Sequence, residues 1–100
     1  MTDSEGKGIR RLVLDVLKPH QPSLPELALE ITKIPGIVGV NISLIEIDRD
    51  TESIKITIEG IDLMFEKIRT QLNEWNCSIH SIDQVVAGRK VIEEAATHTD

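Results

Sequence analysis

The sequence predicts an α+β domain in which two helices pack on one four-stranded antiparallel sheet. Three observations support this prediction: four segments alternate in hydrophobicity, two segments repeat apolar residues at helical spacing, and the order is strand, helix, strand, strand, helix, strand. This order is typical of the ferredoxin-like βαββαβ sandwich, whose sheet has the strand order 4-1-3-2. Because this fold supports many unrelated functions, it predicts an architecture and no reaction.

The first strand and the first helix have clear local signals. Residues 9–17 form an apolar run with the alternation of a strand. Residues 23–34 follow helical spacing, and Ser23 with Glu26 three positions later matches a capping box. We therefore expect the helix to begin at Ser23, and the pair Pro35-Gly36 predicts its end.

Two alternating runs, residues 38–48 and residues 53–59, predict the second and third strands. Their apolar positions share one face and should pack on the helices. The apolar positions change parity from Leu44 to Ile45. A bulge or a strong twist near these two residues is the simplest explanation.

The second helix is expected over residues 62–75, where apolar side chains recur at steps of three and four. Asp62 is the expected N-cap, and Asn76 can take the left-handed conformation that ends a helix. We interpret Trp75 as a core residue because it continues the apolar stripe, the alternative being a stacking platform. A last strand begins at Ser78.

Length and composition predict one domain over residues 8–94, with flexible termini at residues 1–7 and 95–100. A net charge of −6 argues against a nucleic-acid partner, because phosphate binding needs clustered lysines and arginines. The lone Cys77 excludes a disulfide framework and fits a reducing cytosol. No apolar stretch approaches the roughly 20 residues of a membrane span, so we expect a cytoplasmic protein without a membrane partner.

Polar side chains converge on one end of the predicted sheet. In this topology the C-terminal ends of the first two strands lie beside the N-terminal ends of the last two. Carboxylates and imidazoles from four segments therefore meet at one edge, as in ligand and metal sites. The predicted ligand-binding residues are Asp15, Lys18, His20, His80 and Asp83. The predicted metal ligands are Asp15, Glu46, Asp48, Glu52 and His80.

Hard oxygen ligands with one or two histidines favour Mg²⁺, Ca²⁺ or Mn²⁺ over Zn²⁺ as the bound cation. Asp15 is the least ordinary candidate, because an unpaired carboxylate in a central apolar strand would be costly. Its candidate partners are Lys18, Lys55, His80, a cation or a neighbouring subunit. The alternatives stay open: residues 48–53 also fit a solvated hairpin turn, and both histidines also fit ordinary structural positions.

Motifs of known enzyme chemistry are absent from the sequence. There is no P-loop, no GxGxxG, no GxSxG and no HExxH. Cys77 follows the second helix, where no helix N-terminus would lower the pKa of its thiol, so a structural role is favoured over a nucleophile. We therefore expect no catalysis by this chain on its own.

Five segments together carry a family resemblance. They read RLVLDVLKPH at residues 11–20, GVNI at 39–42, EID at 46–48, TESIKIT at 51–57 and SIHSIDQVVAG at 78–88. These segments resemble an archaeal family catalogued as domain of unknown function 211, and the similarity runs from about residue 8 to residue 94. The resemblance implies a ferredoxin-like fold, a compact single domain, and ring-like or other homo-oligomers. It implies no activity and transfers no functional residue.

The sheet edges and the C-terminal tail predict self-association. The second and fourth strands are edge strands, so their backbones carry unpaired groups. Beyond Gly88 a second apolar pair has no role in the six-element fold, and residues 90–93 could extend the last strand or start a short extra one. The predicted interface residues are Val13, Leu17, Arg89, Val91 and Ile92. The alternative is a tail folded back on its own subunit.

The sequence thus predicts a non-catalytic, self-associating binding module. It would assemble with copies of itself, as a closed ring with head-to-tail contacts, and bind a divalent cation or a small polar metabolite at the acidic end of the sheet. One alternative is a pure homo-oligomeric scaffold whose acidic residues pair with basic ones across subunits. Another is a metal-dependent enzyme that uses His80 as its base.

Overall fold

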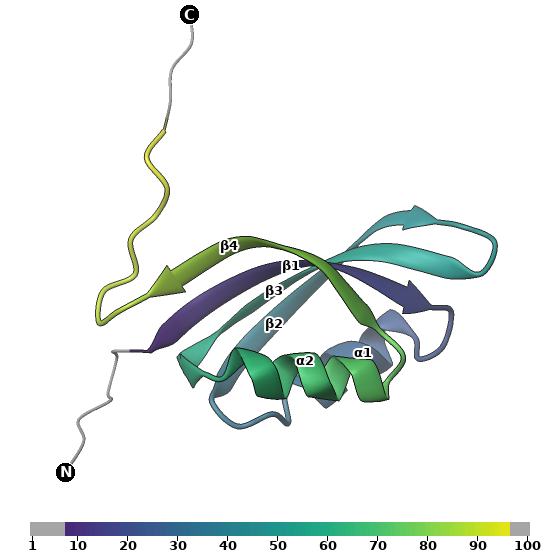
Figure 1. Ribbon diagram of the computed structural model, residues 1–100, viewed down its shortest axis with the longest axis horizontal. Helices are drawn as coiled ribbons and strands as arrows, with labels where there is room; N and C mark the ends of the chain where they lie inside the picture. Colours follow the sequence, from purple (N-terminus) through teal and green to yellow (C-terminus); the bar gives the residue numbers. More distant parts are fainter. Residues whose placement is uncertain (1–7, 97–100) are drawn as a thin grey trace, which may run out of the picture.

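The computed structural model describes residues 8–96, and its elements follow one another in the predicted order (Figure 1). The strands are β1 (Ile9–Pro19), β2 (Ile37–Ile47), β3 (Thr51–Leu63) and β4 (Ser78–Ala87), and the helices are α1 (Leu24–Ile31) and α2 (Phe65–Glu74). One sheet has the order β2-β3-β1-β4, and every neighbouring pair is antiparallel. This order is 4-1-3-2 read from the opposite edge, so the ferredoxin-like α+β fold is confirmed.

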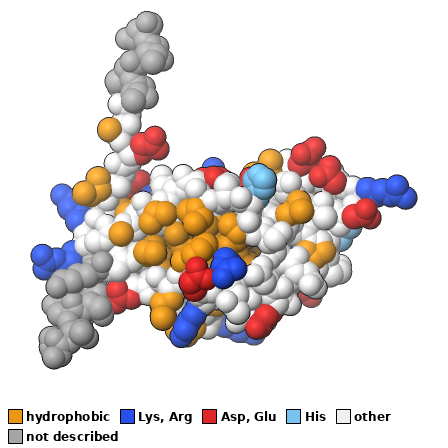
Figure 2. Space-filling model, in the orientation of Figure 1, with side chains coloured by type: hydrophobic (Ala, Val, Ile, Leu, Met, Phe, Trp, Pro, Cys, Tyr) orange, Lys and Arg blue, Asp and Glu red, His pale blue; other side chains and the backbone are white. Residues whose placement is uncertain are grey.

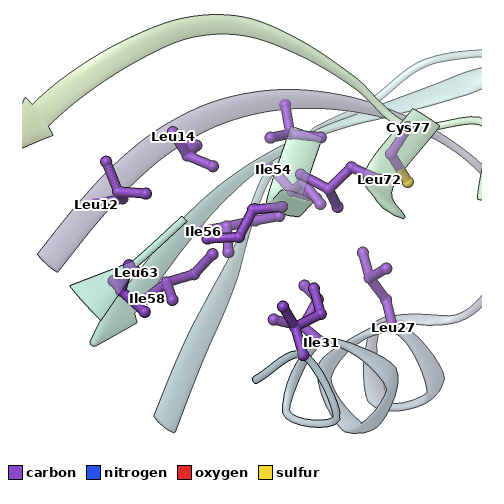
Figure 3. Packing of buried hydrophobic residues seen from close by; sticks show 13 residues of the cluster. Leu12, Leu14, Leu27, Ile31, Ile54, Ile56, Ile58, Leu63, Leu72 and Cys77 are labelled. Atoms are coloured by element: carbon purple, nitrogen blue, oxygen red, sulfur yellow. The ribbon is translucent and has the colours of Figure 1, made fainter. Parts of the chain in front are cut away.

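The core lies between the curved sheet and the two helices, which cover one side of it (Figure 1). Alternate side chains of the central strands β1 and β3 point toward the helices (Figure 3). The fully buried members of this layer include Leu12, Leu14, Val16, Ile54, Ile56, Ile58, Leu27, Ile31, Ile68 and Leu72. Burial of each such side chain contributes roughly 1.5–3 kcal/mol. Within residues 8–96, neither helix is long and apolar enough to cross a membrane.

The capping box at the start of α1 is confirmed. The Glu26 N–H donates to Ser23 Oγ at 3.3 Å, and the Ser23 N–H donates to Glu26 Oε1 at 2.9 Å. The helix ends at Ile31, earlier than the predicted residue 34. After Ile31 the backbone hydrogen bonds join residues three apart, which is the tighter pattern of a 3₁₀ turn. A residue that precedes proline is disfavoured in the helical conformation, so the helix does not continue to Pro35.

The predicted start of the second helix at Asp62 is wrong. Leu63 pairs with Ile9 of β1, so β3 continues through this segment and α2 begins only at Phe65. Asp62 has a φ of 51° and is not the N-cap. At the other end of α2, Asn76 has a φ of 64° and takes the expected left-handed conformation.

Two irregularities predicted from sequence had different outcomes. The register between β2 and β3 shifts between Leu44 and Glu46, which confirms the bulge. The proposed extra strand over residues 90–93 is not formed, because residues 91–96 have no regular secondary structure. Gly88 bends the chain with a φ of 110°, and Arg10 Nη1 donates to the Gly88 and Arg89 carbonyls, which directs the backbone away from the sheet. The expected flexible ends, residues 1–7 and 95–100, lie mostly outside the described residues.

Candidate functional site

The structure brings most of the predicted polar residues to one end of the sheet and divides them between its two faces, whereas Asp83 lies midway along β4. In the ladder of β1 and β3, Lys18 lies opposite Glu52, and Asp15 lies opposite Lys55. Because successive strand residues point to opposite faces, Lys18 and Glu52 point toward the helix side. Asp15 and Lys55 point to the other face of the sheet, which the helices do not cover and which we call the open face. The single site expected from sequence is therefore two separate groups of residues.

Lys18 is a charged side chain with no solvent exposure. Its Nζ donates to the carbonyl oxygens of Pro19 at 2.7 Å and His20 at 3.2 Å, and also to that of Pro22. It forms an ion pair with Glu52 Oε1 at 3.0 Å. An ammonium group has only three donors, so these acceptors satisfy it completely. Such pairing is what makes a buried charge tolerable.

Glu52 links this buried lysine to an exposed histidine. His20 Nδ1 lies 2.9 Å from Glu52 Oε2, and His20 Nε2 lies 2.9 Å from the Arg49 carbonyl oxygen. Both oxygens can only accept, so both bonds form together only when the imidazole is protonated. The bond to Glu52, followed by the bond to Arg49, raises the pKa of His20 above its ordinary value of 6.5. The bonds from His20 and Lys18 lower the pKa of the Glu52 carboxyl.

The Lys18–Glu52–His20 network joins the loop after β1 to the turn between β2 and β3. Lys18 holds the carbonyls of residues 19–22, and His20 reaches across to the turn at Arg49. Two residues predicted to bind a ligand therefore use their polar atoms within the chain itself. The network has the character of a structural clamp.

A small hollow on the open face brings Asp15 and His80 together. It has a volume of about 280 Å³ and is lined by Asp15, Val16, Leu17, Ser53 and His80. None of the ion pairs within residues 8–96 involves Asp15, although Lys55 is its cross-strand neighbour. Asp83 does not line this hollow and accepts a hydrogen bond from Ser81 Oγ at 2.7 Å. Of the predicted ligand-binding set, Asp15 and His80 share a cavity.

The predicted metal ligands are not gathered into one centre. Glu46 and Asp48 are exposed on the hairpin between β2 and β3, and Glu52 is engaged by Lys18 and His20. In the described part of the chain, no three His, Cys, Asp or Glu side chains are placed to hold one metal ion. Metal binding by this set stays a prediction without a preformed site.

Arg11 fastens the C-terminal tail to the open face. Its Nη1 and Nη2 donate to the two carboxylate oxygens of Glu93, each at 2.9 Å, and its Nε donates to Glu59 Oε2 at 2.7 Å. These bonds, that to Glu93 first, raise the pKa of Arg11 above its ordinary value. Glu93 of the tail thus contacts its own subunit through Arg11, while Val91 and Ile92 remain 36% and 71% exposed.

Apolar side chains are exposed along both edge strands. Ile82 and Val85 of β4 are 46% and 52% exposed, and Leu44 of β2 is 44% exposed. Figure 2 shows apolar side chains gathered in the area between β4 and α2. Ile82, Val85 and Leu44 were not among the predicted interface residues. Of those that were, Leu17 and Arg89 are exposed and Val13 is half-buried.

Sequence reasoning missed the burial of Lys18 and a hollow between the helices. The signal for the first was available, because Lys18 continues the alternate positions of the buried face of β1. Trp75, interpreted as a core residue, packs against the core and is half-buried, and it also borders the hollow between α1 and α2. No sequence pattern predicts that hollow, because it depends on how the two helices lie side by side.

Comparisons with known proteins agree with the resemblance seen in the sequence. A model of the family DUF211, described as uncharacterized ArCR, matches residues 10–100. The uncharacterized protein MJ0319 of Methanocaldococcus jannaschii is 52% identical over 93 residues, which are 93% of this chain and 96% of that protein. The similarity therefore extends over all six elements of the fold.

Proposed function

Because this chain belongs to the archaeal DUF211 family, whose description gives no activity, we propose from its own geometry that it is a non-catalytic, self-associating binding module. The observation that carries the proposal is the exposure of apolar side chains along both edges of the sheet. Exposed apolar groups beside unpaired strand edges are typical of surfaces that associate.

The two edges expose their apolar side chains on the same side of the sheet. Ile82, Val85 and Leu44 lie opposite buried residues of β1 and β3 in the strand ladders. Directly opposed residues point to the same face, so all three point to the helix side. They are nonetheless about half exposed, because the edges of the sheet lack neighbouring strands.

Pairing β4 of one subunit with β2 of the next would continue the sheet. These strands run antiparallel within the subunit, so an antiparallel pair between subunits preserves the strand pattern. The backbone groups of both edges would be paired, and the apolar side chains of the two edges would meet on the helix side of the sheet. Because the two edges differ, the contact is heterologous and generates a ring if its rotation closes. The exposed Val91 and Ile92 follow β4 and would lie near this contact.

Replacement of both Ile82 and Val85 by aspartate is expected to convert the assembly into monomers of 11.2 kDa. The reason is that two charges would have to be buried without partners at the joined edges. Light scattering coupled to size exclusion measures the mass. Leu29→Asp is the matched control, because Leu29 is 66% exposed but lies on α1.

A monomeric full-length protein would contradict the proposal of self-association. An unchanged assembly in the double aspartate variant would remove β4 from the interface. A chain truncated after Gly88 tests the role of the tail. The truncation is expected to weaken the assembly without abolishing it. If truncation alone yields monomers, the tail and not the sheet edge carries the contact.

The hollow at Asp15 supports a second proposal, that the module binds a small polar ligand or a divalent cation on its open face. Asp15, Ser53 and His80 converge there with one carboxylate, one hydroxyl and one imidazole. The carboxylate has no ion-pair partner within residues 8–96, so a cationic ligand could pair with it.

Melting curves recorded with EDTA and with added Mg²⁺, Ca²⁺, Mn²⁺ or Zn²⁺ test the cation form of this proposal. A cation that binds the folded state raises the melting temperature, and Asp15→Ala is expected to remove that rise. Asp50→Ala, at an exposed position in the hairpin turn, should retain it. The absence of any rise in the wild type would exclude these cations.

A further inference from the structure

A hollow between the two helices has the dimensions of a small-molecule site. It has a volume of about 510 Å³ and lies between α2 and the residues at the end of α1. Its lining includes Trp75, Ile34, Pro35, Lys67 and the carboxylates of Glu30 and Glu66. A second, more open hollow of about 810 Å³ adjoins it and shares Glu30, Lys33 and Trp75. Ligand sites in proteins typically have volumes of about 300–1,000 Å³.

Trp75 provides the aromatic wall of this groove. It lies at the C-terminal end of α2, is half-buried, and packs against the core, so its position is held by the fold. It borders both hollows, and Ile34 and Pro35 add apolar surface from the other side. A held indole ring beside open space is suited to stacking with a planar ligand.

Within residues 8–96, the ion pairs of the groove leave one of its two lysines without a carboxylate partner. Lys33 pairs with Glu30 at 2.9 Å, and Glu66 pairs with Arg69 at 2.6 Å, so both lining carboxylates already have partners. Lys67 takes part in none of the ion pairs within residues 8–96. A ligand with an acidic group would therefore meet an unpaired ammonium, whereas a cationic ligand would have to compete with two existing ion pairs.

We propose that this groove binds a small planar molecule with one acidic group, stacked on Trp75 with its acid directed to Lys67. The apolar wall accommodates the ring, and Thr70 places a hydroxyl on the same side of the groove as Lys67, three residues away on α2. The site is separate from the hollow at Asp15, so the two proposals succeed or fail independently.

2-Naphthoate is a suitable probe, and 2-naphthamide has the same ring system without the charge. Trp75 is the only tryptophan, so its indole N–H gives one resolved signal in a ¹H–¹⁵N spectrum and reports on this groove alone. Titration of the full chain with 2-naphthoate is expected to shift this signal in a saturable manner. We expect 2-naphthamide to bind about three- to tenfold more weakly, as the loss of one charge-assisted contact implies.

Two lysine variants decide the orientation of the probe. Lys67→Gln should weaken the binding of 2-naphthoate by the same factor and leave the affinity for 2-naphthamide unchanged. Lys90→Gln is the matched control, because Lys90 is an exposed lysine of the tail and should leave both affinities unchanged. The unliganded position of the indole signal shows whether each variant keeps the fold around Trp75.

The absence of a saturable shift at Trp75 with millimolar 2-naphthoate would overturn the groove as a site for this class of ligand. Equal binding of the acid and the amide, unaffected by Lys67→Gln, would overturn the role of Lys67. Binding that weakens equally in Lys67→Gln and Lys90→Gln would show attraction by general charge, and would also contradict the proposal.

Discussion

Replacement of Lys18 by methionine is expected to lower the free energy of unfolding by about 3 kcal/mol. Methionine fills the space of the lysine stem but offers no donor to the carbonyls of Pro19, His20 and Pro22. These acceptors surround a side chain with no solvent exposure, and methionine would leave them without the donor that pairs with them there.

Urea denaturation followed by circular dichroism measures this loss. Lys55→Met is the matched control, because Lys55 is an exposed lysine on the neighbouring strand β3, and its replacement should change stability by no more than about 0.5 kcal/mol. If both variants are equally stable, water or a rearranged loop satisfies the carbonyls, and the clamp has no energetic role.

The second large effect concerns the pH dependence of stability, which Glu52→Gln should alter. The folded protein raises the pKa of His20 above 6.5, so the stability that this histidine contributes is present below pH 6.5 and is lost as pH rises through the raised value. The folded protein lowers the pKa of Glu52 below 4.5, so its contribution is present above pH 4.5 and is lost as pH falls through the lowered value.

Between pH 4.5 and pH 6.5, His20 and Glu52 therefore both make their full contribution to the free energy of unfolding. In this interval the difference in unfolding free energy between the wild type and Glu52→Gln should be largest. Above it the difference should shrink as His20 loses its proton, but it should not vanish, because Lys18 still pairs with Glu52. Denaturation at several pH values measures the profile, and an NMR titration of His20 should show its pKa falling in Glu52→Gln.

His80→Gln serves as the control for this profile, because His80 lies exposed on β4 and forms no bond to Glu52. We expect it to keep the wild-type pH dependence. A flat stability difference between wild type and Glu52→Gln from pH 4 to pH 9 would contradict the protonated state that we assign to His20.

Local signals in the sequence predicted most of the elements correctly. The capping box at Ser23 acts within one turn of helix, and strand alternation acts between neighbouring residues, so neither needs distant partners. The errors fall where distant contacts decide. Asp62 is a suitable N-cap locally, but Leu63 pairs with Ile9 of β1, and this pairing keeps the segment in β3.

The candidate site shows the same division. Its residues were expected at one end of the sheet, and the strand order places Asp15, Lys18 and Glu52 toward that end but leaves Asp83 midway along β4. Their separation onto two faces follows from side-chain parity and could have been predicted for Lys18 and Asp15. The partners of Lys18 could not, because three of them are backbone carbonyls whose positions depend on the folded loop.

The sequence by itself determined the order of the six elements, the apolar face of each central strand and the family to which the chain belongs. These properties depend on residue types at short spacing. Only the tertiary structure decided that Lys18 is buried in a clamp, that Asp15 faces a hollow with His80, and that Trp75 borders a groove. Burial and pairing depend on which distant segments meet, and the free energy of a charge changes by several kcal/mol with that choice.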